Sequence, residues 1–504
     1  MKEKLKPIIY IVLFLATLVI SYFAVCYSTF YNSSLLNYDS SVFYLIGRGI
    51  KNGYIPYKEL ADHKGIYIFF VNYLGALLLE KKFIGIFVVN LLINYFYVIS
   101  LYKIVSLFFQ NKIISIMTAL TSFVLATSYF FCQGGMKCET MLMPIVMYTY
   151  YIYLQHLTSG TKECFERRKV FMVGIGIGIT LFTKANISIC FLPIVITCLI
   201  EILEKKKYNL LIINCVFGLL GILNGIAPAI IYGFLTNSLK EMFYYTFIVN
   251  FLYVGGLYYE YNDLMDAFLN TIITFRWVLL FSIIGLFTSK KTIKNEKVFL
   301  FLILSFVANA FASFMALRPY TYQAYPMIFN IMWFFIFFYG SLDYLADKIH
   351  SLILVKKKAI VILFLIISIA FLGLYTYKFS YKENLIHGYR QYLVNKEIEK
   401  YYKKGDHILV IGAAIGTYNY LETFPTIKNF CTPHTTNKFI EPMYEELLES
   451  LKNAENDWVI TSFTPIMNRS SFPRKVNELL DEKYNYVDDI PLAPATIYKK
   501  SDKQ

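Results

Sequence analysis

The sequence predicts a polytopic α-helical membrane protein that ends in a small α/β domain. Its 504 residues are 57% hydrophobic and only 16% charged, with a mean hydropathy of +0.51, whereas an ordinary soluble domain is about one quarter charged. Apolar runs of membrane-spanning length recur as far as residue 379, and residues 380–504 then alternate short strand-like and helix-like segments. This composition excludes a disordered chain, a small disulfide scaffold and an average soluble enzyme.

The positive charge belongs to the apolar part of the chain. The formal net charge is +14, yet residues 380–504 hold 16 basic and 17 acidic residues. The excess of positive charge therefore lies within residues 1–379, where it is better explained by membrane topology than by a nucleic-acid partner.

The apolar runs predict eleven membrane spans. The first follows a basic N-terminus and lacks a small-residue cleavage site, so we expect an uncleaved helix and not a signal peptide. The predicted spans are 7–27, 84–108, 113–131, 140–157, 170–183, 187–203, 209–232, 271–287, 298–317, 326–344 and 359–376.

The segment 66–79 decides the orientation. It is apolar but short, and if it lies along the outer interface, 20 of the 32 basic residues outside the tail fall in inner loops. The positive-inside rule then places the N-terminus in the cytoplasm and the C-terminal domain outside the plasma membrane. We therefore expect two domains: a transmembrane domain, 1–379, whose first outer loop is 28–83, and an extracytoplasmic α/β domain, 380–504.

The tail pattern predicts strands at HILVIG, DWVITS, NYVDDI and ATIYKK, with amphipathic helices over 441–454 and 472–484. VIGAAIG resembles a nucleotide loop, but a plain strand-to-helix turn fits better. The GIGIG run at 174–178 lies inside a span, where close helix packing is the expected role. A disulfide between Cys132 and Cys138 is left open, and the cysteines show no metal-binding spacing.

Asp39 is the first candidate for chemistry. It follows the first span by about a dozen residues and opens the sequence DSSVFYLIGRGI. A carboxylate beside the outer leaflet needs water, a metal ion or a proton-transfer role. The alternative is that Asp39, with Ser40 and Ser41, caps the helix that follows, and the two interpretations are compatible.

Further candidates lie at the outer ends of helices. The run Asp62, His63 and Lys64 suits an anionic group such as a phosphate, although a solvated turn is its alternative. Glu139 opens the span 140–157 and is expected to face Asp39 across one cavity as a second carboxylate, and the alternative is a helix N-terminal charge. Lys184 interrupts 170–203 and is either a snorkelling lysine or a ligand. Arg318, in the run RPYTYQAY, is ambiguous in the same way.

Taken in order, these pieces resemble a known family. An early loop Asp is followed by GYIPY and DHKG, an outer acid, a TK pair near a helix end, and RPYTY before a Pro-started span. This pattern resembles the GT-C fold membrane glycosyltransferases, the relatives of protein O-mannosyltransferases and aminoarabinose-lipid transferases. The resemblance covers about residues 7–345, and its most specific part is 53–65.

The resemblance implies a site and a reaction. It implies Asp39 as the catalytic carboxylate, Glu139 as an assisting acid, and a donor lipid phosphate held by basic residues at the outer face. The phosphate ligands it implies are His63, Lys64, Lys184 and Arg318. Aromatic rings near the outer face suit sugar stacking, and the substrate-contacting residues we expect are Tyr57, Asp62, Tyr320 and Tyr322.

The implied substrates are a polyprenyl-phosphate-linked sugar, hexosyl or pentosyl, and an envelope acceptor such as a wall polymer, teichoic acid, glycolipid or protein. Because Ser40 follows Asp39 where many relatives carry a second acid, a metal-bound mechanism is less supported; a divalent metal is left open and no cofactor is assigned. The alternative functions are a lipid-linked glycan flippase, a polysaccharide polymerase or ligase, and a non-catalytic assembly partner.

Overall fold

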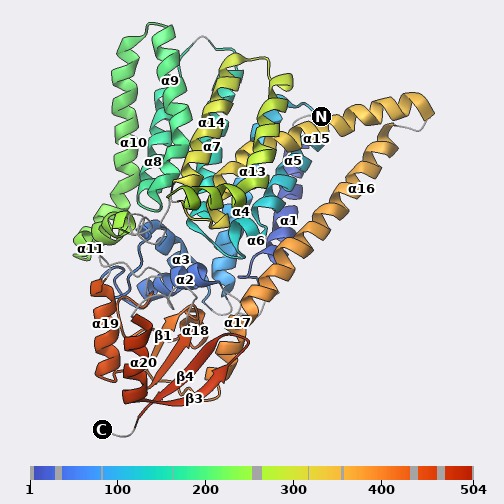
Figure 1. The fold of residues 1–504 in the computed structure, drawn as a ribbon. Coiled ribbons are helices and arrows are strands. Elements are labelled where there is room, and N and C mark those ends of the chain that lie inside the picture. The colour runs from blue at the N-terminus through green and yellow to red at the C-terminus, as the bar shows by residue number, and fades with distance from the viewer. Residues whose placement is uncertain are drawn as a thin grey trace. The chain divides into compact units, whose positions relative to one another are not determined.

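The computed structural model describes residues 5–28, 37–80, 83–161, 163–252, 264–315, 317–353, 357–431, 441–462 and 472–501. It is a helical protein with one small sheet near the C-terminus (Figure 1). Over these residues, eight helical segments are long and apolar enough to cross a membrane. The protein is therefore a multi-pass membrane protein, as the sequence predicts. The predicted orientation of its termini stays a prediction.

The chain divides into two compact units. The helical unit comprises Met1–Val25, Asn90–Pro228 and Met265–Lys382, and the loop-and-tail unit comprises Cys26–Val89, Ala229–Leu264 and Glu383–Gln504. The segment 28–83, which the sequence predicts as the first outer loop, thus groups with the C-terminal tail. The predicted domain boundary at residue 379 stays a prediction.

Every one of the eleven predicted spans corresponds to a helix. Those that lie wholly or mostly in the helical unit are α1 (Leu5–Ala24), α4 (Ile84–Phe108), α5 (Lys112–Ala126), α7 (Cys138–Thr158), α8 (Arg167–Leu181), α9 (Leu192–Glu204), α10 (Tyr208–Leu235), α13 (Leu264–Thr292), α14 (Glu296–Phe314), α15 (Ile328–Ile353) and α16 (Lys357–Thr376). Shorter turns join them: α6 (Tyr129–Cys132), the 3-10 turns η2 (Ala185–Phe191) and η4 (Thr321–Met327), and the π-helical turn η5 (Tyr377–Tyr381).

The predicted span 113–131 is broken near its end. Helix α5 stops at Ala126, and α6 follows as a separate turn. The hydroxyl of Thr127 donates to the carbonyls of Phe123 and Val124, and that of Ser128 donates to Leu125. Such side-chain bonds compete with the helical ladder, which explains why an uninterrupted apolar run does not form one helix.

Glycines bring α8 and α10 into close contact. A Cβ on Gly174 would lie 2.3 Å from the Gly218 carbonyl oxygen, and one on Gly178 would lie 2.4 Å from that of Ile222. Gly221 and Gly225 meet carbonyls of α8 in the same way. The GIGIG run is therefore a helix-packing surface, as expected, and small residues allow this approach inside a membrane.

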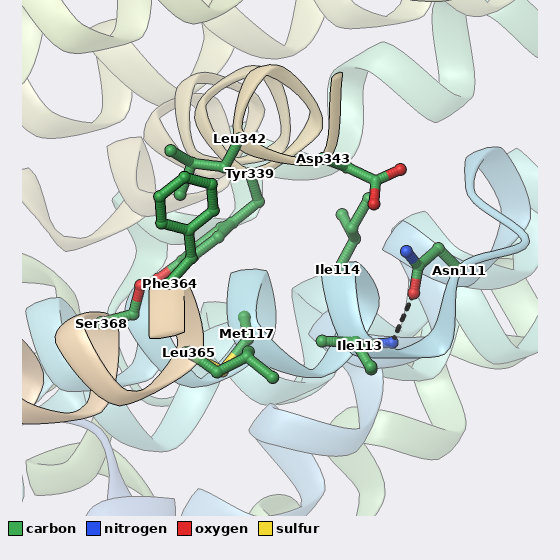
Figure 2. Close-up of a pocket in the computed structure, with 10 residues that line it drawn as sticks. All are labelled: Asn111, Ile113, Ile114, Met117, Tyr339, Leu342, Asp343, Phe364, Leu365 and Ser368. Carbon is green, nitrogen blue, oxygen red and sulfur yellow. Dashed lines mark hydrogen bonds between the residues drawn. The ribbon is translucent and has the colours of Figure 1, made fainter. Parts of the chain in front are cut away.

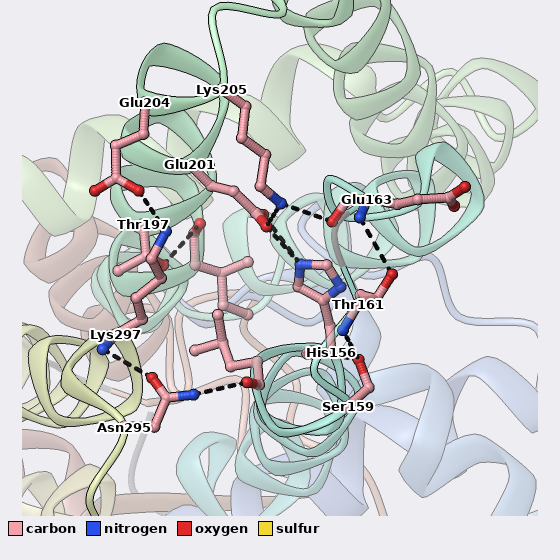
Figure 3. A network of polar contacts seen from close by, with 12 residues as sticks. His156, Ser159, Thr161, Glu163, Thr197, Glu201, Glu204, Lys205, Asn295 and Lys297 are labelled. Carbon is pink, nitrogen blue, oxygen red and sulfur yellow. Dashed lines mark hydrogen bonds and ion pairs between the residues drawn. The ribbon is translucent and has the colours of Figure 1, made fainter.

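A polar network ties α7, α9 and α14 at the end that we predict to face the cytoplasm (Figure 3). Buried His156 Nε2 lies 3.0 Å from a Glu201 oxygen, and Lys205 Nζ donates to Glu201 at 2.7 Å. Asn295 donates to the Leu157 carbonyl at 2.9 Å. The groups satisfy one another, as buried charges must, so this network fastens the helix ends.

The loop-and-tail unit contains α2 (Tyr38–Lys51), α3 (Ile66–Leu78), α11 (Leu239–Phe243), a π-helical turn η3 (Tyr244–Val249), and α17 (Lys382–Ile398). The tail adds β1 (Ile408–Gly412), α18 (Gly416–Tyr420), α19 (Glu441–Lys452), β2 (Trp458–Ser462), α20 (Phe472–Lys483), β3 (Tyr484–Ile490) and β4 (Ala495–Lys500). The four predicted strands and two predicted helices of the tail are confirmed.

The sheet has the strand order β1-β2-β4-β3. Strands β1 and β2 are parallel, with Ile408 opposite Trp458, and the other pairs are antiparallel. Every residue of β1 and β2 is buried, which explains their continuous apolar runs. The VIGAAIG segment is the strand-to-helix turn we expected: Gly412 has φ +111°, and a Cβ there would meet the Ser462 carbonyl oxygen.

The glycine packing yields the first prediction. Replacing Gly178 with Ala forces α8 and α10 apart, and overpacking of this kind costs about 1–3 kcal/mol of stability. We expect a lower thermal unfolding temperature for Gly178→Ala in detergent. Gly373→Ala on α16 is the control, because nothing lies within 4 Å of its Cβ position. Equal unfolding temperatures for the two variants would contradict the close packing.

Candidate active site

The first group of site residues lies in the helical unit and centres on an ion pair. Glu139, in the first turn of α7, is only 1% exposed. Lys184 directly follows the last turn of α8, in extended backbone before η2, and its Nζ donates to Glu139 Oε1. A carboxylate this deeply buried needs a partner of opposite charge. The structure therefore brings together two predicted site residues that are 45 positions apart in the sequence.

A second lysine, which sequence reasoning missed, joins this pair. Lys137 is 3% exposed and precedes α7, where its N–H donates to the Thr140 hydroxyl at 2.9 Å. Its Nζ lies 4.7 Å from the ring centroid of Tyr322, and that of Lys184 lies 5.4 Å from the same centroid. Both ammonium groups thus interact with one aromatic ring, a contact that strengthens as water is removed.

The predicted RPYTYQAY loop continues the group. Tyr320 and Tyr322 are stacked, with ring centroids 5.7 Å apart and planes 7° from parallel. Arg318 is 6% exposed, and its Nη1 donates to the Tyr320 hydroxyl at 3.4 Å. Arg318 Cζ lies 5.9 Å from the Tyr320 ring centroid. We call Lys137, Glu139, Lys184, Arg318, Tyr320 and Tyr322 the cation cluster.

The second group of site residues lies in the loop-and-tail unit and begins at Asp39. The N-cap of α2 is Asn37, whose Oδ1 accepts from the Ser40 N–H at 3.0 Å. The alternative that Asp39 itself caps the helix is therefore wrong, because Asn37 already occupies that position. Asp39 sits one residue inside the helix and is half-buried. It lies in the first turn of α2, where the helix dipole stabilises a negative charge.

The Asp62, His63 and Lys64 run forms a compact turn. The Lys64 N–H donates to Asp62 Oδ1 at 2.8 Å, and His63 Nδ1 lies 3.7 Å from Asp62 Oδ2. Lys64 Nζ contacts His63 Nε2. Burial raises the pKa of Asp62 from 3.8 to about 6, the charge of Lys64 opposes this rise, and the nearby charge of Asp39 adds to it. Asp39 and Asp62 are thus electrostatically coupled neighbours.

Tyr57 holds this turn through a hydrogen bond to its backbone. It adopts φ +69°, which is uncommon for a non-glycine residue. The Tyr57 hydroxyl donates to the Lys64 carbonyl at 2.8 Å, and its side chain has no exposed surface. Its ring stacks on Tyr245, with centroids 6.1 Å apart. The GYIPY sequence therefore fixes the backbone that carries His63 and Lys64.

The candidate residues thus form two groups, one in each unit. The cation cluster holds the predicted Glu139, Lys184, Arg318, Tyr320 and Tyr322, and the first loop holds the rest. The expectation that Glu139 faces Asp39 stays a prediction.

Two further sequence-based questions concern cysteines and metal ions. Cys132 and Cys138 form no disulfide in the structure. Within the described ranges, no group of three or more His, Cys, Asp or Glu side chains is arranged to hold a metal ion.

A pocket elsewhere in the helical unit contains none of the predicted site residues (Figure 2). It lies among α5, α15 and α16 and is lined mainly by apolar side chains such as Met117 and Leu365, with Asn111, Asp343 and Ser368 among its polar residues. The chemistry expected from the sequence needs cations and carboxylates together, so this pocket is not the candidate active site.

Comparison with solved structures identifies the fold. The apo structure of ArnT from Cupriavidus metallidurans matches with a TM-score of 0.55 and 10% identity, covering 97% of each chain. ArnT bound to undecaprenyl phosphate matches with a TM-score of 0.56 and 11% identity, covering 98% of each chain. The chain has the GT-C fold. The resemblance seen in the sequence is confirmed at the level of the fold.

A further likeness, to the Archaeoglobus fulgidus oligosaccharyltransferase, has a TM-score of 0.46 and 12% identity, and covers 97% of this chain and 73% of that one. This score is too low to carry an argument. No protein-family model matches the sequence, and no curated protein matches it either.

The buried Asp62 yields a pH-dependent prediction. Its folded pKa of about 6 lies above the unfolded value of 3.8. The group's contribution to stability is therefore complete below pH 4 and is lost as the pH rises through 6. Asp62→Asn keeps an acceptor for the Lys64 N–H but never ionises. We expect its thermal stability relative to wild type to improve between pH 4 and pH 7, by roughly 1–3 kcal/mol.

The measurement is thermal unfolding of both proteins in detergent at several pH values. A stability difference that stays constant from pH 4 to pH 7 would show that Asp62 titrates as an ordinary carboxyl.

Proposed function

We propose that this protein is a glycosyltransferase that moves a sugar from a polyprenyl-phosphate donor to a cell-envelope acceptor at the outer membrane face, with Asp39 as the general base. The observation that carries the proposal is the cation cluster. It gathers Lys137, Lys184 and Arg318 around two stacked tyrosines, and Lys184 pairs with the buried Glu139 carboxylate.

The charge of the cluster suits a phosphate leaving group. Three cations and the one carboxylate of Glu139 leave two positive charges. A sugar on a polyprenyl phosphate is a phosphodiester with one negative charge, and its departure leaves a monoester with up to about two. Because cations placed where charge develops lower the barrier, the cluster stabilises the leaving group more than the substrate.

The fold supports the same donor. ArnT, whose fold this chain shares, has been solved with undecaprenyl phosphate bound. Lipid phosphates of that kind require an apolar groove for the isoprenoid and a polar end for the phosphate. The buried Lys137 and Arg318 suit the phosphate, and the apolar helices suit the isoprenoid.

The reaction needs a base as well as a phosphate site. In the proposed step, the acceptor hydroxyl oxygen attacks the anomeric carbon while the bond to the donor phosphate oxygen breaks. The phosphate leaves with the bonding electron pair, and the hydroxyl proton passes to the Asp39 carboxylate. Asp39 suits this role because it is half-buried and is not used as the helix cap. The attack from the face opposite the leaving group inverts the anomeric configuration.

The other residues support these two groups. Glu139 acts by holding Lys184 in place, since the two form a direct ion pair. Lys64 and His63 add positive charge to the first loop, and Asp62 fixes the backbone N–H of Lys64. Tyr320 and Tyr322 offer aromatic faces to a sugar ring while supporting Arg318 and the two lysines.

The phosphate site predicts the behaviour of Lys137. Lys137→Gln removes one of the cluster's positive charges, so we expect undecaprenyl phosphate to bind roughly tenfold more weakly to the purified protein. The matched control is Lys103→Gln, since Lys103 also lies over a tyrosine, with its Nζ 5.3 Å from the Tyr151 ring centroid. Equal affinities of the two variants would remove Lys137 from the site.

The proposed base predicts the behaviour of Asp39. Asp39→Asn keeps the size of the side chain but cannot accept the proton, so we expect sugar transfer to fall by about 10²–10⁴-fold while undecaprenyl phosphate still binds. Asp266→Asn is the matched control, because Asp266 is an exposed acid in the first turn of α13. The readout is sugar transfer from a polyprenyl-phosphate-linked donor. Transfer by Asp39→Asn at the wild-type rate would show that another group acts as base.

A further inference from the structure

The strongest feature outside the residues already discussed is a buried arginine on the helix that carries Asp39. Arg48 lies in the last turn of α2 and is 2% exposed. Its Nη2 donates to the Tyr418 carbonyl at 3.0 Å and also contacts the Thr423 carbonyl oxygen. Its guanidinium carbon lies 4.5 Å from the centroid of the Phe424 ring. Glu80 Oε1 lies 3.8 Å from Arg48 Nε, so Glu80 and the C-terminal tail together form the environment of a charge in the first loop.

The same stretch of the tail reaches the other end of α2. Asn419 Nδ2 donates to the Ser41 carbonyl at 2.8 Å, two residues beyond Asp39. Ser41 belongs to the turn whose N–H groups are held by Asn37. The tail therefore contacts α2 at both ends: at the turn that bears Asp39 and at the turn that bears Arg48.

The stretch also holds the Asp62 turn. The Ala61 N–H, directly before Asp62, donates to the Lys428 carbonyl at 3.0 Å. Glu446 on α19 fixes that part of the tail by accepting from the N–H groups of Lys428 and Asn429, at 2.7 Å and 3.1 Å. Asn429 in turn accepts from the Tyr245 hydroxyl at 2.7 Å, and Tyr245 stacks on Tyr57.

The end of the stretch lies beside both acids. The Cys431 thiol is hydrogen-bonded to the Tyr38 hydroxyl. Burial raises the pKa of Cys431, and the charge of Asp62 and then that of Asp39 raise it further. Residues 418–431, which we call the docking segment, therefore lie beside the first-loop acids, although nearly 400 positions separate the two segments in the sequence.

We propose that the docking segment is a positioning element for the Asp39 and Asp62 carboxylates, so that the C-terminal domain takes part in the reaction by fixing the first loop. The proposal rests on the proposed function. It gives the tail a definite role: its sheet anchors a segment whose backbone carbonyls and Asn419 amide set the position of α2. A base displaced by about 1 Å can lose two orders of magnitude in rate.

The test uses the full-length protein and removes one contact. Asn419→Ala deletes the bond to the Ser41 carbonyl without changing any charge. Asn453→Ala is the control, because Asn453 is an exposed asparagine in the same domain. Its amide donates to Glu455 Oε1 at 3.4 Å. We expect Asn419→Ala to lower kcat by roughly ten- to a hundredfold, with the donor KM changed by less than about twofold.

Two readouts separate positioning from a loss of folded protein. Asp62 faces His63, Lys64, Asp39 and Cys431, and burial is the main cause of its raised pKa. Loosening the docking segment hydrates Asp62 and brings its pKa closer to the ordinary value, so the fall in thermal stability that Asp62 causes between pH 4 and pH 7 should be smaller in Asn419→Ala than in the wild type. In an Asp39→Asn background, Asn419→Ala should have little further effect, because residues that act through one group are not additive.

A second variant guards against a misfolded first one. Arg48→Lys keeps the positive charge but loses the guanidinium group whose Nη2 contacts both the Tyr418 and the Thr423 carbonyl oxygens. It should lower kcat and weaken the pH dependence of thermal stability, as Asn419→Ala does. The proposal is overturned if Asn419→Ala matches Asn453→Ala, or if its activity falls by the same factor in both backgrounds while the pH dependence of thermal stability stays that of the wild type. Wild-type turnover by Asp39→Asn is a separate outcome, which would overturn the proposed base.

Discussion

The buried carboxylate of Glu139 is the constraint on which the candidate site depends. At 1% exposure, an unpaired charge at this place would cost several kcal/mol. Lys184, which follows α8, supplies the positive charge that this carboxylate needs at the start of α7. Lys184 then shares the Tyr322 ring with Lys137, and the stacked Tyr320 supports Arg318. One acid therefore organises a site whose remaining charge is positive.

The first loop holds two carboxylates, those of Asp39 and Asp62, close enough to interact electrostatically. Asn37 caps α2, and Asp39 lies in the first turn of the same helix. Asp62 is buried, and its acceptor bond to the Lys64 N–H makes the turn rigid. Tyr57 adopts a left-handed backbone conformation to support that turn. The tail contacts both segments, which links the small α/β domain to the proposed chemistry.

Local patterns in the sequence are sufficient to locate the helices and strands. They do not show which side chains that are distant in the sequence contact one another. Apolar runs located every helix that we expected to span the membrane, and alternating strand and helix patterns located the tail. The span 113–131 was too long because the hydroxyls of Thr127 and Ser128 carry no signal in a hydropathy profile. Sequence reasoning missed Lys137 and Arg48 because the aromatic rings that they contact, those of Tyr322 and Phe424, are distant in the sequence. The acids and cations beside helix ends were found because a charge next to an apolar run is a local feature.

The most direct test of the account is the pool of lipid-linked sugars in cells that lack this protein. If the protein consumes a polyprenyl-phosphate sugar, lipid extracts from such cells should accumulate that donor, and the corresponding sugar should disappear from one envelope component. Restoring the wild-type chain should reverse both changes. Lipid extracts and envelope glycans that are identical with and without the protein would contradict the account.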